Sequence, residues 1–292
     1  MVEYNERYKR GTHLVDVLTD QAVKFMQINQ ENPFFMSLQF YSVHAEREPV
    51  PGLVEKYDPS TVDPVYASMV EMVDMGIGRI LDAVRDLGLK NNTMIVFTSD
   101  NGGVKAVSDQ TPFRSGKGSY FDGGIRVPLV ISWPGHSAQA ALCEVPVTGV
   151  DFYPTFLEAA GVKAPKGKVL DGVSLIPLLK KHGSIPERPI FWHFPVYQES
   201  LAGKADDAHD EYFLTRPGSA VRMGRWKLHE YFEDGRIELY DLAADPAERM
   251  NFQHLHVKTT KKLHNALVEW RKATGAPVPD QPNPEYRPAE TP

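Results

Sequence analysis

Short apolar segments alternate with amphipathic helical segments over the first 160 residues, and this alternation limits the possible folds more than any other feature of the sequence. The predicted buried strands cover residues 34–41, 93–99 and 126–133. The predicted helices cover residues 13–30, 63–88 and 151–160. Strands that alternate with helices form mostly parallel sheets with helices on both faces. We therefore expect an α/β fold with such a sheet.

The helix at 63–88 has the clearest boundaries. Asp63 can accept hydrogen bonds from free backbone N–H groups of the first turn, and Pro64 fits the first helical position. Gly88 follows the last apolar residue and suits the left-handed conformation in which helices often end. In the same way, Asp151 is expected to cap the helix at 151–160.

The pattern changes after residue 185. Antiparallel strands are expected at residues 219–221, 226–232 and 237–240, with a hairpin turn at Asp234 and Gly235. A final helix over 253–273 is expected to turn Leu255, Leu263, Leu267 and Trp270 inward. These changes predict an α/β domain at 1–185, a smaller antiparallel sheet with a terminal helix at 186–275, and an extended tail at 276–292.

Charge and composition exclude several classes of partner. The 292 residues carry 32 Lys and Arg against 38 Asp and Glu, a net charge of −6, which argues against nucleic acid. No apolar run approaches the length of a membrane span, and the first ten residues lack the apolar core of a secretory signal. As encoded, the chain is expected in the cytoplasm. Cys143 is the single cysteine, so an internal disulfide is impossible, and we expect a buried or semi-buried structural thiol.

A carboxylate and an amide follow the predicted strand at 93–99. Asp100 and Asn101 are followed by Gly102 and Gly103, which let a ligand or another backbone approach closely. Ligands of open α/β sheets bind beyond the carboxyl ends of the strands, and these side chains supply the hard oxygens that Ca²⁺ or Mg²⁺ prefers. The alternative is a turn held by its own side chains.

A second candidate site is the glycine-rich segment that precedes the strand at 126–133. It holds Arg114 and Lys117, which can bind the oxygens of a tetrahedral anion. The segment does not match the phosphate-binding motif G-x-x-x-x-G-K-[ST], because Lys117 is followed by Gly118. An exposed flexible loop is the alternative.

Two histidines are weaker candidates. His44 comes shortly after the predicted strand at 34–41, where catalytic groups of α/β sheets gather. His193 lies among aromatic residues, where it could contact a sugar. For both, a structural packing role is the alternative.

Together these motifs resemble one family. The runs FFMSLQFYSVH, TSDNGG, GKGSYFDGGIRVPLVISWPG and MGRWKLHEYFEDGRIELYDLAADPAERMN occur in this order over nearly the whole chain. They resemble the formylglycine-dependent sulfatases of the alkaline-phosphatase-like superfamily, of the arylsulfatase A and N-acetylgalactosamine-6-sulfatase types. The resemblance implies hydrolysis of sulfate esters, of sulfated carbohydrates or aryl sulfates, by proteins that are usually periplasmic, secreted or lysosomal.

The resemblance also implies roles for individual residues. Asp100 and Asn101 match two ligands of the active-site divalent cation, usually Ca²⁺. Lys117 and His44 match catalytic residues that contact the sulfate group, the histidine as a proton donor to the leaving oxygen. Arg114 and His193 are expected to contribute to substrate binding.

Two family features are absent from these 292 residues. The C/S-x-P-x-R signature, whose cysteine or serine becomes formylglycine, is not present, and Cys143 does not fit it. No aspartate pair precedes His44 to complete the metal site. The chain thus matches the C-terminal two-thirds of a sulfatase, and the missing N-terminal fragment is a candidate partner. Alone, the chain is expected to be marginally stable, with unpaired strand edges, and not to hydrolyse sulfate esters at a useful rate.

Two alternative functions remain open. One is a non-catalytic remnant that binds sulfate or sulfated glycans. The other is a metal-dependent phosphohydrolase of the same superfamily, because the fold alone does not decide the reaction.

Overall fold

The computed structural model describes residues 12–199, 207 and 212–281. The chain divides into two compact units. The first comprises Met1–Val96 and Ile131–Gly135, and the second comprises Phe97–Val130 and His136–Pro292. These units do not coincide with the segments 1–185, 186–275 and 276–292, which stay a prediction about domain organisation.

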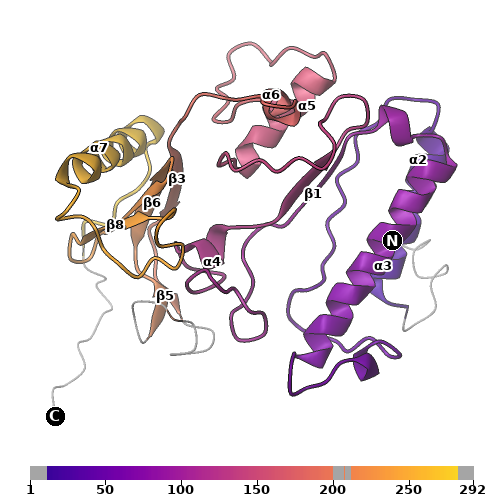
Figure 1. The fold of residues 1–292 in the computed structure, drawn as a ribbon, viewed down its shortest axis with the longest axis horizontal. Helices are drawn as coiled ribbons and strands as arrows, with labels where there is room; N and C mark the ends of the chain where they lie inside the picture. Colours follow the sequence, from indigo (N-terminus) through magenta and orange to yellow (C-terminus); the bar gives the residue numbers. More distant parts are fainter. Residues whose placement is uncertain (1–11, 200–206, 208–211, 282–292) are drawn as a thin grey trace. The chain divides into compact units, whose positions relative to one another are not determined.

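Two long helices form the first unit. Helix α2 (Leu14–Asn29) packs against α3 (Pro64–Asp86), as Figure 1 shows, and both match the helices predicted from the sequence. The carboxylate of Asp63 accepts a hydrogen bond from the backbone N–H of Tyr66 at 2.9 Å, which caps α3 as expected. The apolar core of this unit is made of Val15, Val50, Met69 and Met72. Short 3₁₀ turns lie at Val54–Lys56 and Lys90–Asn92.

The prediction of a buried strand at 34–41 is wrong. The segment forms no strand, because it has no ladder partner among the described residues. Its side chains nevertheless alternate between covered and exposed, and Phe40 packs against the core beside α3 while Phe35 and Tyr41 face solvent. The apolar run therefore reflects one covered face and not burial on both faces.

Two short strands pair near the predicted positions. Strands β1 (Ile95–Thr98) and β2 (Leu129–Ser132) form a two-stranded sheet. The prediction that these strands are buried is wrong, because Phe97 is 44% exposed and Val130 is 58% exposed. A sheet of two strands leaves apolar side chains without a covering layer.

Several short helices follow in the second unit. They are α4 (Asp122–Ile125), a 3₁₀ turn at Gly149–Asp151, α5 (Phe152–Ala159) and α6 (Ile176–Leu179). Asp151 is the N-cap residue of α5 as predicted, but its side chain forms no capping hydrogen bond there and instead completes a capping box with Thr148 one turn earlier. The buried Asp151 carboxylate also accepts hydrogen bonds from the N–H of Val173 and from Arg188, so it ties α5 to the segment that precedes α6.

The C-terminal part of the second unit contains an antiparallel sheet. Its strand order is β3 (Ile190–Phe194), β6 (Gly218–Met223), β7 (Trp226–Tyr231) and β8 (Ile237–Asp241). The three later strands and the turn at Asp234 confirm the prediction, whereas β3 and the small pair β4 (Gln198–Glu199) and β5 (Phe213–Thr215) were not predicted.

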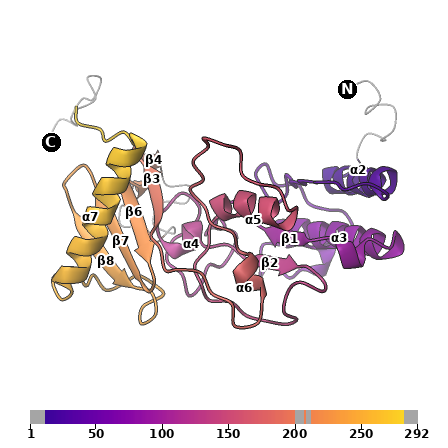
Figure 2. The ribbon, with the colours of Figure 1, turned by 90° about the horizontal axis from the view of Figure 1, so that it is seen from above.

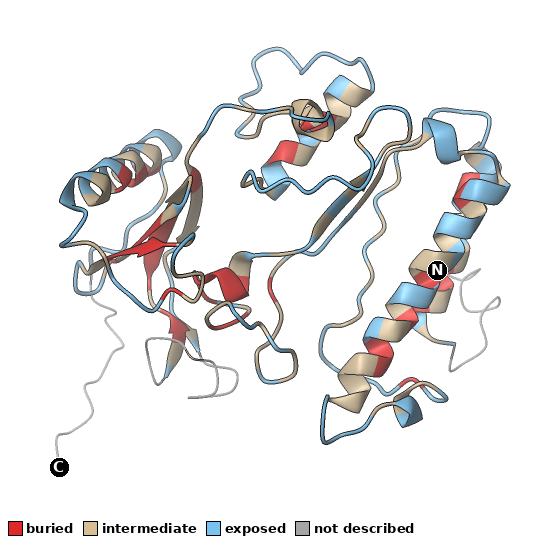
Figure 3. Ribbon diagram, in the orientation of Figure 1, coloured by how far each residue is buried: buried red, intermediate tan, exposed pale blue. Residues whose placement is uncertain are grey.

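Helix α7 (Val257–Thr274) lies across one face of this sheet, as Figure 2 shows. The shared core consists of Val221, Leu228, Leu239, Leu263 and Leu267. Leu255 does not face inward as predicted: it precedes α7 and is exposed. Buried residues continue from the sheet to α4, so both faces of the sheet are covered (Figure 3).

The lengths and hydropathy of the helices and the exposure of Cys143 complete the description of the fold. No described helix has both the length and the apolar character that crossing a membrane requires. Cys143 is exposed, which corrects the prediction of a buried or semi-buried thiol; the cysteine lies in an irregular segment and not in a core element.

Candidate functional site

The turn after β1 carries the first candidate residues. Asp100 is exposed, and one oxygen of its carboxylate accepts a hydrogen bond from the backbone N–H of Asn101 at 2.9 Å. The side-chain amide of Asn101 donates to the carbonyl of Gly102 at 2.9 Å. These bonds fix the turn locally, as the structural alternative predicted. They use the nitrogen atoms of Asn101 and not its side-chain oxygen.

Backbone hydrogen bonds join this turn to the glycine-rich segment. Gly102 donates to the carbonyl of Gly124 at 2.9 Å, and the N–H of Lys117 donates to the carbonyl of Gly103 at 2.9 Å. A Cβ atom at Gly102 would lie 1.9 Å from the carbonyl oxygen of Gly123, so only glycine permits this approach. The structure thus brings the Asp100 turn and the Lys117 segment into direct contact.

Lys117 lies within this contact and is half-buried. Its backbone is held by Gly103, but its ammonium forms no hydrogen bond or ion pair with any residue in the described part of the chain. A lysine whose backbone is fixed and whose charge is uncommitted can bind an anion.

Arg114 already has partners. Its guanidinium lies 4.2 Å from the centre of the Phe121 ring. The Nε and Nη1 groups donate to the carbonyls of Asp207 at 2.9 Å and Glu248 at 3.1 Å. These contacts hold the start of the glycine-rich segment, and its predicted contact with substrate stays a prediction.

His193 is likewise engaged, on strand β3. Its Nε2 lies 2.9 Å from the carbonyl of Pro277, and its Nδ1 lies 2.8 Å from the hydroxyl of Ser219. Because a carbonyl only accepts, Nε2 carries the proton and Nδ1 accepts from Ser219. Burial lowers the pKa of His193, which favours this neutral form. The contacts match the packing alternative, and the predicted role in substrate binding stays a prediction.

His44 belongs to the first unit, whereas the other candidates belong to the second. It is exposed, its Nδ1 lies 2.8 Å from the carbonyl of Ala45, and its ring lies 5.7 Å from that of Tyr41. Within a single unit, the structure therefore brings together Asp100, Asn101, Arg114 and Lys117.

The described residues supply only part of a cation site. They contain no group of three or more His, Cys, Asp or Glu side chains suited to a metal ion. Asp100 and Asn101 offer two oxygen ligands of the right chemistry, whereas Ca²⁺ takes about six to eight. The donor set among the described residues is therefore incomplete.

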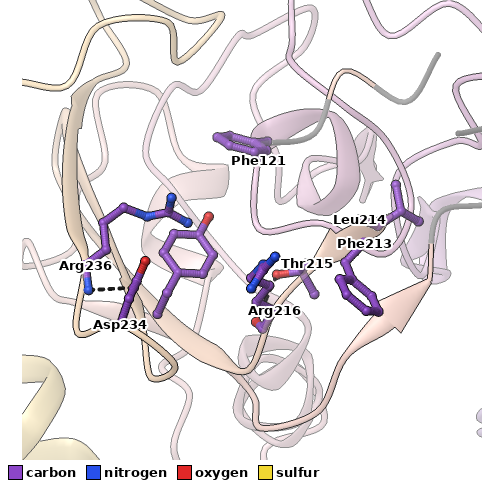
Figure 4. Close-up of a pocket in the computed structure, with 8 residues that line it drawn as sticks. Phe121, Phe213, Leu214, Thr215, Arg216, Asp234 and Arg236 are labelled. Carbon is purple, nitrogen blue, oxygen red and sulfur yellow. Dashed lines mark hydrogen bonds between the residues drawn. The ribbon is translucent and has the colours of Figure 1, made fainter. Parts of the chain in front are cut away.

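A cavity of about 220 Å³ lies beside the antiparallel sheet. Figure 4 shows Phe121, Leu214, Thr215 and the two arginines at 216 and 236 around it. The arginines are paired with Glu233 and Glu238, so the cavity is not a free cationic pocket. Sequence reasoning gave no signal for it, because its lining comes from four separate segments.

Charged residues at the centre of the second unit were also missed. Asp122, Lys227, His229 and Glu248 are buried together. The alternation in β7 places Lys227 and His229 on the face opposite the one that packs on α7, and that face was assigned no role from the sequence. The available signal was Asp122, a carboxylate within an otherwise glycine-rich and apolar segment.

This combination of a strand-end turn, a glycine-rich lysine segment and a helix-covered antiparallel sheet has known counterparts. The solved structure of Ps i-CgsB in complex with k-i-k-neocarrahexaose superposes with a TM-score of 0.74 at 26% identity, covering 90% of this chain and 56% of that one. The family model Sulfatase matches residues 1–162, and the model of the N-sulphoglucosamine sulphohydrolase C-terminal region matches residues 116–273. The chain belongs to the sulfatase family, and the predicted alkaline-phosphatase-like α/β class is confirmed.

Further relatives agree. A sulfatase from Formosa agariphila is 32% identical over 91% of this chain and 51% of its own length. The structure of BT4656 in complex with its substrate D-glucosamine-2-N,6-O-disulfate has a TM-score of 0.57 at 29% identity, covering 75% of this chain and 42% of that one. The chain spans about half the length of the relatives it matches. The family is generally metal-dependent.

Proposed function

We propose that this chain forms part of a site that hydrolyses sulfate esters of carbohydrates. The observation that carries the proposal is the backbone contact between the Asp100 turn and the Lys117 segment, which brings into one unit a lysine whose ammonium has no partner among the described residues and two side chains with hard oxygen ligands. The family membership and the disulfated sugar bound by BT4656 support sulfate as the group recognised.

Lys117 is the residue we assign to the sulfate group. Cleavage of a sulfate ester builds negative charge on the sulfonyl and leaving oxygens, and a fixed cation stabilises that charge. The hydrogen bond from the Lys117 N–H to Gly103 fixes the backbone from which the ammonium extends. His44 is proposed to protonate the leaving oxygen. Arg114 and His193 are proposed to contact the substrate, for which they must exchange their present carbonyl partners.

Asp100 and Asn101 are proposed to hold a divalent cation of the Ca²⁺ type, with further ligands from elsewhere. Such a cation would polarise a sulfonyl oxygen when bound. The nucleophile is assigned to no residue of the 292, because C/S-x-P-x-R does not occur among them. A segment with that signature and two aspartates, on the same or another polypeptide, is the partner that this site requires.

Binding without turnover is the second candidate, favoured by the same absence of the nucleophile signature. It keeps the role of Lys117 in anion recognition and removes the covalent step. Both candidate functions therefore require Lys117 to bind the anion, and they differ only in whether inorganic sulfate is released.

Titration calorimetry of the 292-residue chain, with CaCl₂ present, tests the recognition step. D-glucosamine-2-N,6-O-disulfate should bind, and Lys117→Ala should weaken binding roughly 10- to 100-fold, because a hydrogen bond to a charged group contributes about 1.5–3 kcal/mol. Lys168→Ala, at an exposed lysine elsewhere in the unit, is the matched control and should leave binding unchanged. No heat with wild type, or equal effects of both substitutions, would overturn the proposal.

Sulfate release separates the candidates. The chain alone should release none, and addition of the segment with C/S-x-P-x-R should produce release that Lys117→Ala abolishes. Continued absence of release would favour binding without turnover. Release of phosphate from glucosamine 6-phosphate at a higher rate would instead identify a phosphohydrolase.

A further inference from the structure

Four buried titratable side chains meet between α4 and the antiparallel sheet, and we call them the buried charge cluster: Asp122, Lys227, His229 and Glu248. Their side chains are at most 3% exposed. The Lys227 Nζ lies 2.8 Å from Asp122 Oδ1 and 3.0 Å from Glu248 Oε1. His229 Nε2 lies 3.4 Å from the same Glu248 oxygen. The proposed chemistry uses none of these groups.

Such a cluster requires every charge to be compensated, because a buried unpaired charge is strongly destabilising. Burial raises the pKa of Glu248, but the Lys227 charge, the contact with His229 and the hydrogen bond from the Asp122 N–H together outweigh it and lower the pKa to about 2. Burial lowers the pKa of His229, so the imidazole stays neutral. Arg126 and Arg222 approach the second Asp122 oxygen to 3.6 and 3.9 Å. The two carboxylates therefore face three cations.

Glu248 joins the glycine-rich segment, which holds Arg114 and Asp122, to Lys227 on the antiparallel sheet. Its Oε2 accepts a hydrogen bond of 2.6 Å from the backbone N–H of Asp122, and its Oε1 pairs with Lys227. Its own carbonyl accepts from Arg114 at 3.1 Å. Glu248 has a backbone φ of +51°, which residues other than Gly, Asn and Asp rarely adopt. The contacts above therefore hold Glu248 in this conformation.

Two fixed residues, Arg114 and Asp122, lie on either side of Lys117 in the sequence. Arg114 lies three residues before it, and Asp122 lies five residues after it. The loop is also closed by a hydrogen bond of 3.1 Å from the Gly123 N–H to the Arg114 carbonyl. Beyond Asp122, the carbonyl of Gly124 accepts from Gly102 in the Asp100 turn. The cluster therefore fixes residues on both sides of Lys117, and a second anchor lies within the loop, where the Tyr120 hydroxyl contacts the carbonyls of Phe194 at 3.0 Å and Gly218 at 2.8 Å.

We propose that Asp122, Lys227 and Glu248 are positioning residues: they fix the loop 114–124 to the antiparallel sheet and thereby hold Lys117 and the Asp100 turn in place. The consequence for sulfate binding rests on the proposed function. The fixation of the loop does not depend on the proposed function, because it follows from the contacts alone.

Amide hydrogen exchange measured by mass spectrometry tests the fixation directly. In Lys227→Met and in Glu248→Gln, amides of 114–126 should exchange at least 10-fold faster relative to those of 263–271 in α7, because the loop loses its anchor while the apolar face of the sheet is intact. Asp151→Asn is the matched control: it disturbs another buried carboxylate–arginine pair in the same unit, and the ratio between the two peptides should not change. A uniform rise across both peptides in the Lys227 and Glu248 variants would show a purely structural cluster and overturn the proposal.

The double variant Lys227→Met/Glu248→Gln covers the case in which a single variant fails to fold. It removes one charge of each sign, so the remaining Asp122 keeps Arg126 and Arg222. The exchange ratio should still rise at least 10-fold, and an unchanged ratio would contradict the proposal.

Titration of the same proteins with sodium sulfate supplies the functional measurement. Sulfate affinity should fall at least fivefold in the double variant and stay constant in Asp151→Asn. If wild type binds no sulfate, the proposed function fails while the exchange result still decides the positioning role. If wild type binds sulfate and the double variant binds it equally well, the positioning role is wrong.

Discussion

The two larger sheet structures of this chain are stabilised in different ways. The antiparallel sheet of β3, β6, β7 and β8 has Val221, Leu228 and Leu239 packed on α7, and Lys227 and His229 buried on the opposite face. The β1–β2 pair has a partly exposed Phe97 and an exposed Val130. The first sheet is covered on both faces, whereas the described part of the chain leaves side chains of the second sheet exposed. The difference indicates that the antiparallel sheet is the rigid support of the candidate site.

The largest expected difference concerns the polar face of the antiparallel sheet. Lys227→Met leaves Asp122 and Glu248 buried without their shared cation, and such a loss costs about 3–5 kcal/mol. Lys272→Met, at an exposed position of α7, should change the free energy of unfolding by less than about 0.5 kcal/mol. Chemical denaturation monitored by tryptophan fluorescence measures both. A change below about 1 kcal/mol for Lys227→Met would show that the cluster contributes little net stability.

The apolar residues of the two sheets give the next comparison. Leu228→Ala opens a cavity under α7 and should cost about 2–5 kcal/mol. Val130→Ala on β2 removes a side chain that is already exposed and should cost less than about 0.5 kcal/mol. The free energy of unfolding of each variant decides the comparison. Equal losses would mean that β2 is covered in solution, for example by association of two chains.

The smallest effect is a dependence on pH. The pKa of Glu248 is lowered to about 2, so the carboxylate binds fewer protons in the folded state than in the unfolded state. Its stabilising contribution is complete above the ordinary glutamate value and is lost as the pH falls from there towards 2. This contribution is at most about 3 kcal/mol, at 1.36 kcal/mol for each pKa unit.

Thermal unfolding between pH 5 and pH 2 measures that loss. Glu248→Gln cannot titrate, so its curve should be flatter than that of wild type. Glu158→Gln makes the same chemical change at an exposed glutamate of α5, so it serves as the control and should leave the wild-type slope unchanged. Parallel curves for wild type and Glu248→Gln would assign the acid sensitivity to other carboxylates.

Features that depend on local sequence could be predicted. The bounds of α3 follow from Asp63, Pro64 and Gly88, and the β7–β8 hairpin follows from Asp234 and Gly235. These signals act over a few residues, where capping and turn geometry decide the conformation. The turn at Asp100 and the position of Lys117 in a glycine-rich loop were predicted for the same reason.

Features that depend on distant partners could not be predicted. The segment 34–41 has the composition of a strand but no ladder partner among the residues described. The burial of Lys227 and His229 was not predicted, because the residues that compensate them, Asp122 and Glu248, are distant in the sequence. The carbonyl partners of Arg114 and His193 are likewise distant in sequence, so no local pattern shows that these side chains are already engaged.

At the contact between the Asp100 turn and the glycine-rich segment, the glycines cannot be substituted, whereas the lysine side chain takes no part in the contact. A Cβ at Gly102, Gly123 or Gly124 would lie 1.9 to 2.4 Å from a carbonyl oxygen, so these positions cannot vary without moving the backbone. Lys117 joins the same contact only through its main-chain N–H, which any residue except proline supplies. The side chain at position 117 can therefore change without rebuilding the loop, so the charge that the loop presents is set independently of its backbone.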